Sequence, residues 1–437
     1  MDEQARALAY AQAAGRMLQL PTVYERDKPL PEAFGQFYRL LEELFPQVHR
    51  CCRRLDFDGS FLFEWQGRTP GEALVLMSHH DVVAAPGEWK VPPFSGLVQD
   101  GKLWGRGALD VKGNLFCMLQ AMEELLAGGY VPEHTVYLVS SCMEEVGGND
   151  KIADYFAREK VAIGLLLDEG TPILEQPLPG LAGKWALVSV AEKGYMDVRF
   201  VARSAGGHSM APPKNGPLPR LGAFMAACEK HPVFRPAASP ACREMLHRAA
   251  KGFSGWKKLA CKWPGGPWLE ALLGPIQRLT AQTSMAFTMA QGSQATNVLP
   301  TEASVVANLR LAPQDTPEWC MEQLQQAAAP YGLEAVCLKS VAPSPVADCT
   351  GPGFALVERA VKRALPGVGV LPFVLSGGTD TKHFHGVCGC CLRFTPLLVT
   401  TAQQATVHGK NENIDYAALP GAVDFFKALI QEQGGAQ

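Results

Sequence analysis

Three short apolar runs, each ending at a cluster of histidine or acidic residues, constrain the fold of this chain more than any other feature. The runs cover residues 73–77, 136–140 and 163–167, and runs of this length are typical of buried strands in a parallel sheet. The segments between them, such as 114–126 and 150–159, have helical spacing, which gives a β-α-β rhythm. The sequence therefore predicts an α/β fold with a mostly parallel sheet sandwiched by helices.

The polar clusters follow the carboxyl ends of these expected strands, where ligands bind in open α/β sheets. We therefore expect one sheet edge to collect His79, Asp81, Glu144, Glu145 and Asp168. Carboxylates packed this closely repel one another, which raises their pKa values unless a counter-ion lies between them. Bound cations are the simplest remedy, and histidine with carboxylate is a zinc-type ligand set.

The length and the changing pattern of the chain indicate two domains. A chain of 437 residues is too long for one ordinary core. After Pro177, strand-like segments at 187–191, 196–202 and 303–311 suit an antiparallel sheet, and an irregular, largely helical segment covers 220–279. We predict a catalytic domain made of residues 1–184 and 314–437, interrupted by an inserted α+β domain at 185–313.

Composition argues against a nucleic-acid or membrane partner. The net charge of −3 provides no basic footprint for nucleic acid. No apolar stretch approaches the roughly eighteen residues that a membrane span needs. The N-terminal segment lacks the basic-then-apolar layout of a signal peptide, so we expect a cytoplasmic location.

The thirteen cysteines are odd in number and irregularly spaced, which argues against a disulfide framework. Cys388, Cys390 and Cys391 form a cluster that either binds a metal or consists of buried free thiols. Free cysteine prefers the interior, so we expect buried thiols.

Five motifs in a fixed order give the chain a family resemblance. They are Ser-His-His-Asp-Val-Val at 78–83, Gly-Arg-Gly-Ala-Leu-Asp-Val-Lys-Gly at 105–113, Glu-Glu-Val-Gly-Gly at 144–148, Gly-His-Ser at 207–209 and Gly-Gly-Thr-Asp at 377–380. The chain resembles the dizinc metallopeptidase family of aminoacylase-1, glutamate carboxypeptidase and carboxypeptidase S. The Asp-Glu-Gly at 168–170 and the long helical insert are most similar to the carboxypeptidase S branch, which includes hydrolases of N-fatty-acyl amino acids.

The resemblance implies a role for each acidic or imidazole residue of these motifs. Two Zn²⁺ ions are expected per chain, with Co²⁺ or Mn²⁺ as possible substitutes. Asp81 is expected to orient a histidine ligand, and Glu144 to act as the general base. The implied metal ligands are His79 and Asp168 for one zinc, Glu145 for the other, and Asp110 as the bridge between them. The last implied ligand is a histidine near the C-terminus, and His408 fits that place.

Alternatives stay open at several of these positions. Glu169 competes with Asp168, and both His383 and His385 compete with His408. Asp110 also suits a helix N-cap. His80 lies between a ligand and its orienter, and we interpret it as a packing or pocket-lining residue.

The inserted domain supplies further candidates through the same resemblance. In the family this domain covers the site and mediates dimerisation, so a homodimer is expected. His208 is expected to stabilise the oxyanion in the partner subunit's site. Asn297, Arg310 and the backbone N–H of Gly378 are expected to hold the substrate's carboxylate or carbonyl oxygen. A turn histidine and a structural ion pair are the competing interpretations of His208 and Arg310.

These features predict a zinc-dependent hydrolase that cleaves an amide bond beside a free carboxylate, as a carboxypeptidase or dipeptidase does on short peptides. The alternative is a deacylase of N-acyl amino acids. Its acyl channel would be lined by Phe253, Trp256, Trp263, Trp268 and Phe287, which could equally form the core of a helical layer. A remote alternative is a catalytically inactive binding protein on the same fold.

Overall fold

The computed structural model describes residues 2–148, 150–262, 267–274 and 281–434, except for the side chains of residues 267, 268 and 270. Its contacts divide the chain into two compact units. The first unit comprises Met1–Val190, Ala347–Pro372 and Gly378–Gln437, and the second comprises Ala191–Val346 and Phe373–Gly377. Within the described ranges, no helix has the length and apolar character that a membrane span requires.

The first unit is built on a sheet with nine described strands, in the order β1-β2-β6-β3-β7-β17-β9-β16, with β8 paired to β9. The central pairs β6–β3, β3–β7 and β7–β17 are parallel, and β1–β2, β2–β6, β17–β9 and β8–β9 are antiparallel. The strands are β1 (Arg53–Phe57), β2 (Ser60–Trp65), β3 (Ala73–His79), β6 (Val136–Ser141), β7 (Ile163–Asp168), β8 (Ile173–Glu175), β9 (Lys184–Glu192), β16 (Val368–Leu375) and β17 (Cys391–Arg393). The predicted α/β class with a mostly parallel central sheet is confirmed.

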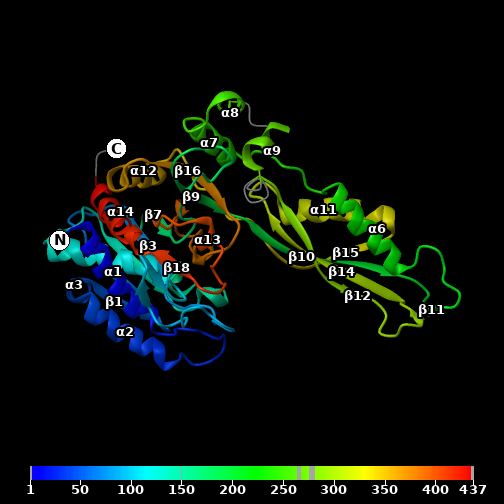
Figure 1. The fold of residues 1–437 in the computed structure, drawn as a ribbon, viewed down its shortest axis with the longest axis horizontal. Coiled ribbons are helices and arrows are strands. Elements are labelled where there is room, and N and C mark those ends of the chain that lie inside the picture. The colour runs from blue at the N-terminus through cyan, green and yellow to red at the C-terminus, as the bar shows by residue number, and fades with distance from the viewer. Residues whose placement is uncertain (1, 149, 263–266, 275–280, 435–437) are drawn as a thin grey trace. The chain divides into compact units, whose positions relative to one another are not determined.

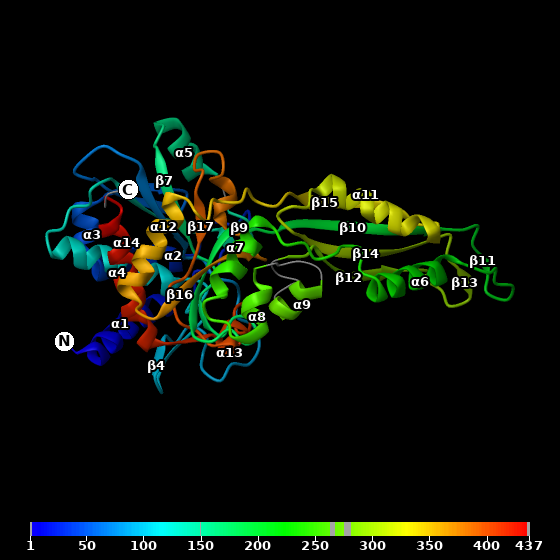
Figure 2. The same ribbon diagram turned by 90° about the horizontal axis from the view of Figure 1, so that it is seen from above.

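Helices pack against this sheet because each has an apolar side to bury (Figures 1 and 2). On α5 (Lys151–Glu159), Ile152 and Phe156 enter a core cluster with Val75 and Val139 of the sheet. Neighbouring helices α1, α4, α12 and α14 pack on one another. The other helices of this unit are α1 (Glu3–Leu18), α2 (Glu32–Leu44), α3 (Pro46–Cys51), α4 (Lys112–Ala127), α12 (Pro352–Ala364), α13 (Thr401–Gln404) and α14 (Leu419–Glu432).

A small three-stranded sheet joins distant parts of the first unit. It consists of β4 (Leu97–Gln99), β5 (Lys102–Trp104) and β18 (Asn413–Asp415), in the order β18-β5-β4. In the antiparallel β18–β5 pair, Asn413 lies opposite Trp104. The loop before β18 is thereby held beside the loop after β5, and each of these loops carries predicted metal ligands.

The second unit has an antiparallel sheet in the order β12-β14-β10-β15, covered on one face by helices α6 and α11. Phe200 on β10 and Phe224 on α6 lie at the centre of this core, with ring centroids 4.6 Å apart. The elements are β10 (Gly194–Arg203), β11 (Gly207–His208), β12 (Ser284–Gln291), β13 (Val298–Leu299), β14 (Glu302–Leu311), β15 (Glu334–Val341), α6 (Pro217–Lys230), α7 (Pro240–Ala249), α8 (Gly255–Ala260), α9 (Pro267–Leu273) and α11 (Pro317–Ala328).

The second unit ends later than the sequence suggested. We expected the chain to return to the catalytic domain at residue 314, but α11 (Pro317–Ala328) and β15 (Glu334–Val341) belong to the second unit, which continues to Val346. The reason is the long-range pairing of β15 with β10, which places α11 on the same sheet. No pattern in the sequence indicated that pairing.

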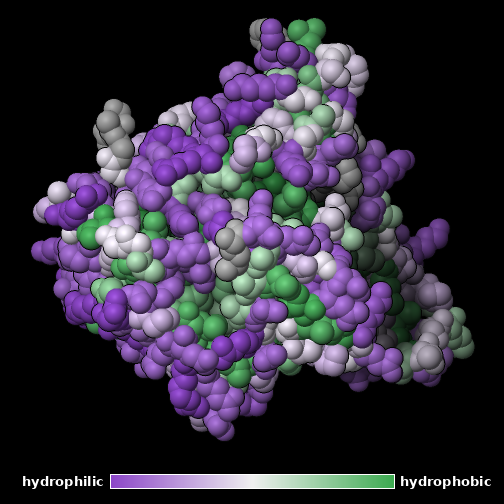
Figure 3. Space-filling view, turned by 60° about the vertical axis from the view of Figure 1, so that its left-hand side comes forward, coloured by the Kyte–Doolittle hydropathy of each residue, from purple (hydrophilic) through white to green (hydrophobic). Residues whose placement is uncertain are grey.

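Polar residues predominate on the surface, and the clustered cysteines lie mostly in the interior. Figure 3 shows a face on which hydrophilic residues predominate and hydrophobic residues form separate patches. Cys388 and Cys391 are buried free thiols, while Cys390 is half-buried. This agrees with the expectation of interior thiols for two of the three clustered cysteines.

Candidate metal centre

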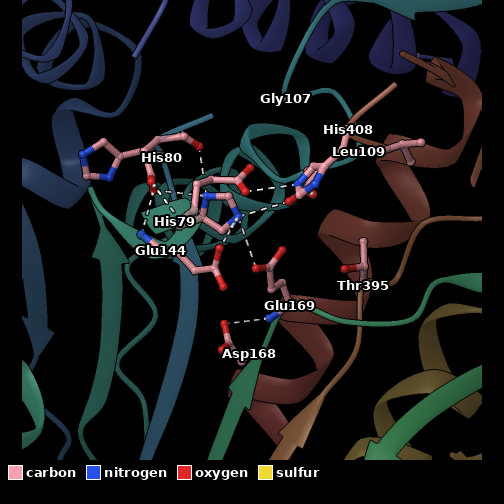
Figure 4. Close-up of polar contacts among 12 residues, drawn as sticks. His79, His80, Gly107, Leu109, Glu144, Asp168, Glu169, Thr395 and His408 are labelled. Carbon is pink, nitrogen blue, oxygen red and sulfur yellow. Dashed lines mark hydrogen bonds and ion pairs between the residues drawn. The ribbon is translucent and has the colours of Figure 1, made fainter. Parts of the chain in front are cut away.

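The side chain of His79, at the carboxyl end of β3, is buried and held from both sides (Figure 4). Its Nδ1 lies 2.9 Å from the backbone oxygen of Asp81 and 3.3 Å from Asp81 Oδ1. Its Nε2 lies 3.1 Å from Asp110 Oδ1 and 3.2 Å from Glu169 Oε1. Asp81 therefore fixes the ring so that Nε2 points at carboxylates, which is the geometry of a metal-ligating histidine with its orienting partner.

Asp81 also positions the two neighbouring glutamates. The buried Asp81 carboxylate accepts the backbone N–H groups of Glu144 at 3.2 Å and of Glu145 at 3.1 Å. These residues form the short 3₁₀ turn that follows β6. A single carboxylate thus ties the end of β3 to the turn after β6.

A second cluster forms around His408, which reaches the centre from a loop near the C-terminus. Its Nε2 lies 3.0 Å from Asp110 Oδ2 and 3.1 Å from Glu145 Oε2. The two oxygens of Asp110 thus face two different histidines, Oδ1 toward His79 and Oδ2 toward His408. This is the arrangement expected of a bridging carboxylate.

The competing histidines lie elsewhere. His383 Nε2 is 3.4 Å from the backbone oxygen of Gly147, and His385 Nε2 is 3.3 Å from Arg393 Nη2. His80 is buried, stacks on Phe37 at 5.2 Å and contacts Ser140 Oγ at 2.8 Å through Nδ1. The structure therefore favours His408 as the ligand and a packing role for His80.

The structure places Glu169, and not Asp168, beside His79. The buried Asp168 Oδ1 accepts the backbone N–H of Glu169 at 2.8 Å, and Figure 4 shows its carboxylate directed away from the His79 ring. Asp168 also accepts a hydrogen bond from the side chain of Thr379. Asp168 is the last residue of β7 and Glu169 the first residue after it, and of the two only Glu169 contacts His79. Glu169, the alternative to Asp168, is thus the acid beside His79, and the ligand role of either acid stays a prediction.

Burial and mutual repulsion perturb the protonation of this cluster, as predicted. Burial raises the pKa of Glu144 to about 8; the charge of His79 opposes this rise, and the charges of Asp380 and Glu145 add to it. Burial likewise raises the pKa of Glu169 to about 8. Burial lowers the pKa of His79, but Glu169, Asp110 and Asp81 outweigh it and hold that pKa well above its ordinary value.

These residues fit a pair of divalent cations. In two sets, His79 with Asp110 and Glu145, and His79 with Glu144 and Glu169, the donor atoms lie within 4.8 Å of one another. Among the described residues, no donor reaches the buried Oε1 of Glu145 or the buried Oδ2 of Asp168. A cation satisfies such an oxygen, and imidazole with carboxylate suits zinc. His79, Asp110 and Glu169 would hold one ion, and Asp110, Glu145 and His408 the other.

Glu144 belongs to one of these sets but lies farthest from the histidine. Its Oε2 is 3.9 Å from His79 Nε2, whereas the corresponding Glu169 distance is 3.2 Å. Glu169 is thus the better placed of the two for an ion, and the acid–base role expected of Glu144 stays a prediction.

Three of the predicted substrate-binding and oxyanion residues lie in the second unit. His208, on β11, is exposed, and its Nδ1 accepts the backbone N–H of Met210 at 3.0 Å. Asn297 lies on the adjoining segment, where its backbone oxygen accepts the N–H of Ser209 at 3.0 Å. The structure thus brings His208 and Asn297 together on one ribbon, and their roles stay predictions.

The contacts of Arg310 and Gly378 do not test their predicted roles in binding the substrate's carboxylate or carbonyl oxygen. Arg310, on β14, lies over the ring of Tyr195 at 5.0 Å, a cation–π contact that neither expectation for it included. Gly378 follows β16 in the first unit, and a Cβ added there would meet no atom within 4 Å.

Two residues that the sequence analysis did not single out lie directly behind the centre. Glu412 and Arg106 form a fully buried ion pair, with Arg106 Nη1 2.6 Å from Glu412 Oε2. Arg106 stood within the Gly-Arg-Gly motif, and Glu412 stands four residues after His408. Each residue lies close in sequence to an implied metal ligand, and this was the only hint that the sequence offered. Sequence alone does not show that two residues so far apart in the chain form an ion pair.

The fold and the paired clusters define the class of protein, a metal-dependent hydrolase with an inserted α+β domain. The model of peptidase family M20/M25/M40 matches residues 75–432, and the chain belongs to this family. Metal dependence and hydrolysis follow from that membership. The resemblance to the carboxypeptidase S branch is confirmed by the relatives.

The relatives that match almost the whole chain include the following two. The N-fatty-acyl-amino acid synthase/hydrolase PM20D1 of Mus musculus is 30% identical over 440 residues, covering 97% of this chain and 88% of the relative. The probable carboxypeptidase S-like 2 of Dictyostelium discoideum is 29% identical over 426 residues, covering 93% and 80%.

Solved structures show the same fold at lower identity. Human carnosine dipeptidase 1 superposes with a TM-score of 0.67 at 15% identity, covering 98% of this chain and 97% of that one. The M20 family metallo-carboxypeptidase Sso-CP2 of Sulfolobus solfataricus gives a TM-score of 0.66 at 18% identity, covering 98% and 100%.

Proposed function

We propose that this metallo-hydrolase cleaves the amide bond between an acyl group and an amino acid whose carboxylate is free. The observation that carries the proposal is the Asp110 carboxylate, which faces His79 through one oxygen and His408 through the other. Such a bridge serves two cations that share one substrate. We propose zinc for both, with cobalt or manganese as possible substitutes.

Bound zinc would polarise the scissile carbonyl and lower the pKa of a bound water to about 7. Glu144 is the chain's own acid–base group. Bound cations favour its ionised form, so it takes the proton of the attacking water and delivers it to the leaving amine nitrogen. Asp81 contributes indirectly, because it holds both the His79 ring and the backbone of Glu144.

N-acyl amino acids and short peptides both present such an amide. The naming of PM20D1 as an N-fatty-acyl-amino acid synthase/hydrolase supports the first class, and the carboxypeptidase S-like relative supports the second. Because the PM20D1 match covers more of both chains, we favour N-acyl amino acids and keep dipeptides as the second candidate.

The aromatic residues of the insert do not decide between these classes. Phe287 packs on Phe224 at 5.9 Å within the core of the second unit, while Trp256 is 53% exposed. Phe253 is buried. Trp263 and the side chain of Trp268 lie outside the described residues. The choice of acyl group therefore rests on the relatives and not on a described acyl channel.

A substrate panel tests the proposal. The zinc-loaded protein should release amino acid from N-acetyl, long-chain N-acyl and dipeptide substrates at different rates, with the long-chain compounds fastest. Matched substrates with an amidated C-terminus should be hydrolysed far more slowly. Equal rates on amidated and free substrates would contradict the carboxylate requirement, and no hydrolysis of any member would favour the inactive binding protein. A homodimer and a cytoplasmic location stay predictions.

A further inference from the structure

The carboxylate of Glu412 lies behind the metal centre and is fully buried. Its Oε1 accepts the backbone N–H groups of Leu109 at 2.7 Å and Asp110 at 3.1 Å. Its Oε2 accepts Arg106 Nη1 at 2.6 Å and the backbone N–H of Gly107 at 3.1 Å. All four donors come from the one loop that ends at the bridging ligand.

Arg106 extends this contact to the second ligand loop. It is buried, and its Nη2 donates to the backbone oxygen of Gly409 at 2.8 Å. The guanidinium also lies over the ring of Trp89 at 5.2 Å, which fixes its plane. Because Gly409 follows His408 directly, one guanidinium and one carboxylate join the Asp110 loop to the His408 loop.

Such a pair is costly to bury and therefore indicates a geometric requirement. Desolvation of two charges offsets much of their attraction, whereas removing one partner leaves an uncompensated charge in the interior. The pair is held by charge-assisted hydrogen bonds, which are the strong and directional kind. Glu412 accepts all four of these hydrogen bonds from the segment 106–110, so its effect is concentrated at Asp110.

We infer that Glu412, together with Arg106, is a positioning residue that holds Asp110 and His408 in one geometry and thereby sets zinc affinity at the Asp110–Glu145–His408 group. The inference rests on the proposed ligand assignment. Glu412 belongs to neither group of donor atoms that would hold an ion, and its carboxylate is occupied by donors of the chain. It acts through the backbone of the bridging residue.

The test compares Glu412→Gln with Glu123→Gln as a matched control. The amide introduced at position 412 turns an NH₂ group toward two of the four donors while keeping the volume. Glu123 is a suitable control because it also accepts backbone N–H groups, those of Gln47 and Val48 at the start of α3, away from the centre. Zinc affinity is measured by competition with a chromophoric chelator, and thermal unfolding is recorded without metal.

Glu412→Gln should bind one of its two zinc equivalents about 10- to 100-fold more weakly, the range typical of groups that support metal ligands. Glu123→Gln should lower the unfolding temperature but keep wild-type zinc affinity. Wild-type affinity in Glu412→Gln would overturn the inference, and so would an equal loss of affinity in both variants, since that would indicate general destabilisation.

Arg106→Lys covers the case in which Glu412→Gln does not fold. Lysine keeps a cation beside Glu412 but lacks the planar fork that also reaches Gly409. Its zinc affinity should fall in the same direction, and unchanged affinity would refute the inference. Failure of the proposed function is distinguishable, because it would appear as no hydrolysis of the substrate panel by the wild-type chain, whereas failure of this inference would appear as unchanged zinc affinity in the variants.

Discussion

Replacing Glu144 by glutamine tests whether this residue acts as the general base or as a metal ligand. The substitution removes the proton acceptor but preserves the side chain's size and the backbone hydrogen bond from residue 144 to Asp81, which is 3.2 Å long. The turn after β6 should therefore keep its shape. Burial raises the pKa of Glu144 to about 8 before an ion binds, and bound cations then favour the ionised form that a base requires.

The expected effect is a loss confined to turnover. General acid–base catalysis contributes roughly 10²- to 10⁴-fold. We expect kcat of Glu144→Gln to fall by about that factor, equivalent to about 3–5 kcal/mol of transition-state stabilisation, with KM little changed. Both zinc equivalents should remain, because Glu144 Oε2 lies 3.9 Å from His79 Nε2, farther than Glu169.

The assay measures initial rates on an N-acyl amino acid together with the zinc content of the same preparation. Turnover within tenfold of wild type would refute the assignment of Glu144 as the base. Loss of one zinc equivalent would instead place Glu144 among the ligands. Glu144→Asp is the graded control: it restores a carboxylate on a shorter side chain, and its kcat should lie between those of wild type and Glu144→Gln.

Three further predictions concern the other ligands and the core of the second unit. Glu169→Gln should lose a zinc equivalent that its neighbour variant Asp168→Asn retains; retention by both, measured by elemental analysis, would contradict the assignment of Glu169 as a ligand. The hydrogen bonds that His408 donates to Asp110 and Glu145 raise its pKa to about 10 before an ion binds, so zinc must displace a proton at pH 7. Zinc affinity should therefore increase as pH rises toward 10, and calorimetry in two buffers of different ionisation enthalpy should detect the released proton; a pH-independent affinity would refute this. Phe224→Ala, in the core of the second unit, should cost about 3–5 kcal/mol in unfolding free energy, whereas an unchanged denaturant midpoint would contradict its packing role.

The parallel sheet made part of the centre predictable from sequence. His79, Glu144 and Glu145 follow apolar runs, and the carboxyl ends of parallel strands meet at one edge. Asp110 and His408 have no such signal. They come from loops whose meeting depends on the antiparallel pairing of β18 with β5, and only the family resemblance pointed to them. The later boundary of the second unit depended in the same way on a long-range strand pair.

The remaining difficulty is that ligands and supporting groups share the same chemistry, so residue type alone cannot separate them. Asp168 and Glu169 are adjacent acids at the end of β7, and only the folded backbone there shows which one faces His79. Glu412 is as acidic and as buried as a ligand, yet its oxygens are satisfied by N–H donors of the chain. Glu145 differs, because its Oε1 meets no such donor in the described part of the chain. A buried carboxylate with a complete set of chain donors positions its neighbours, whereas one that faces histidines and other carboxylates is available to a cation.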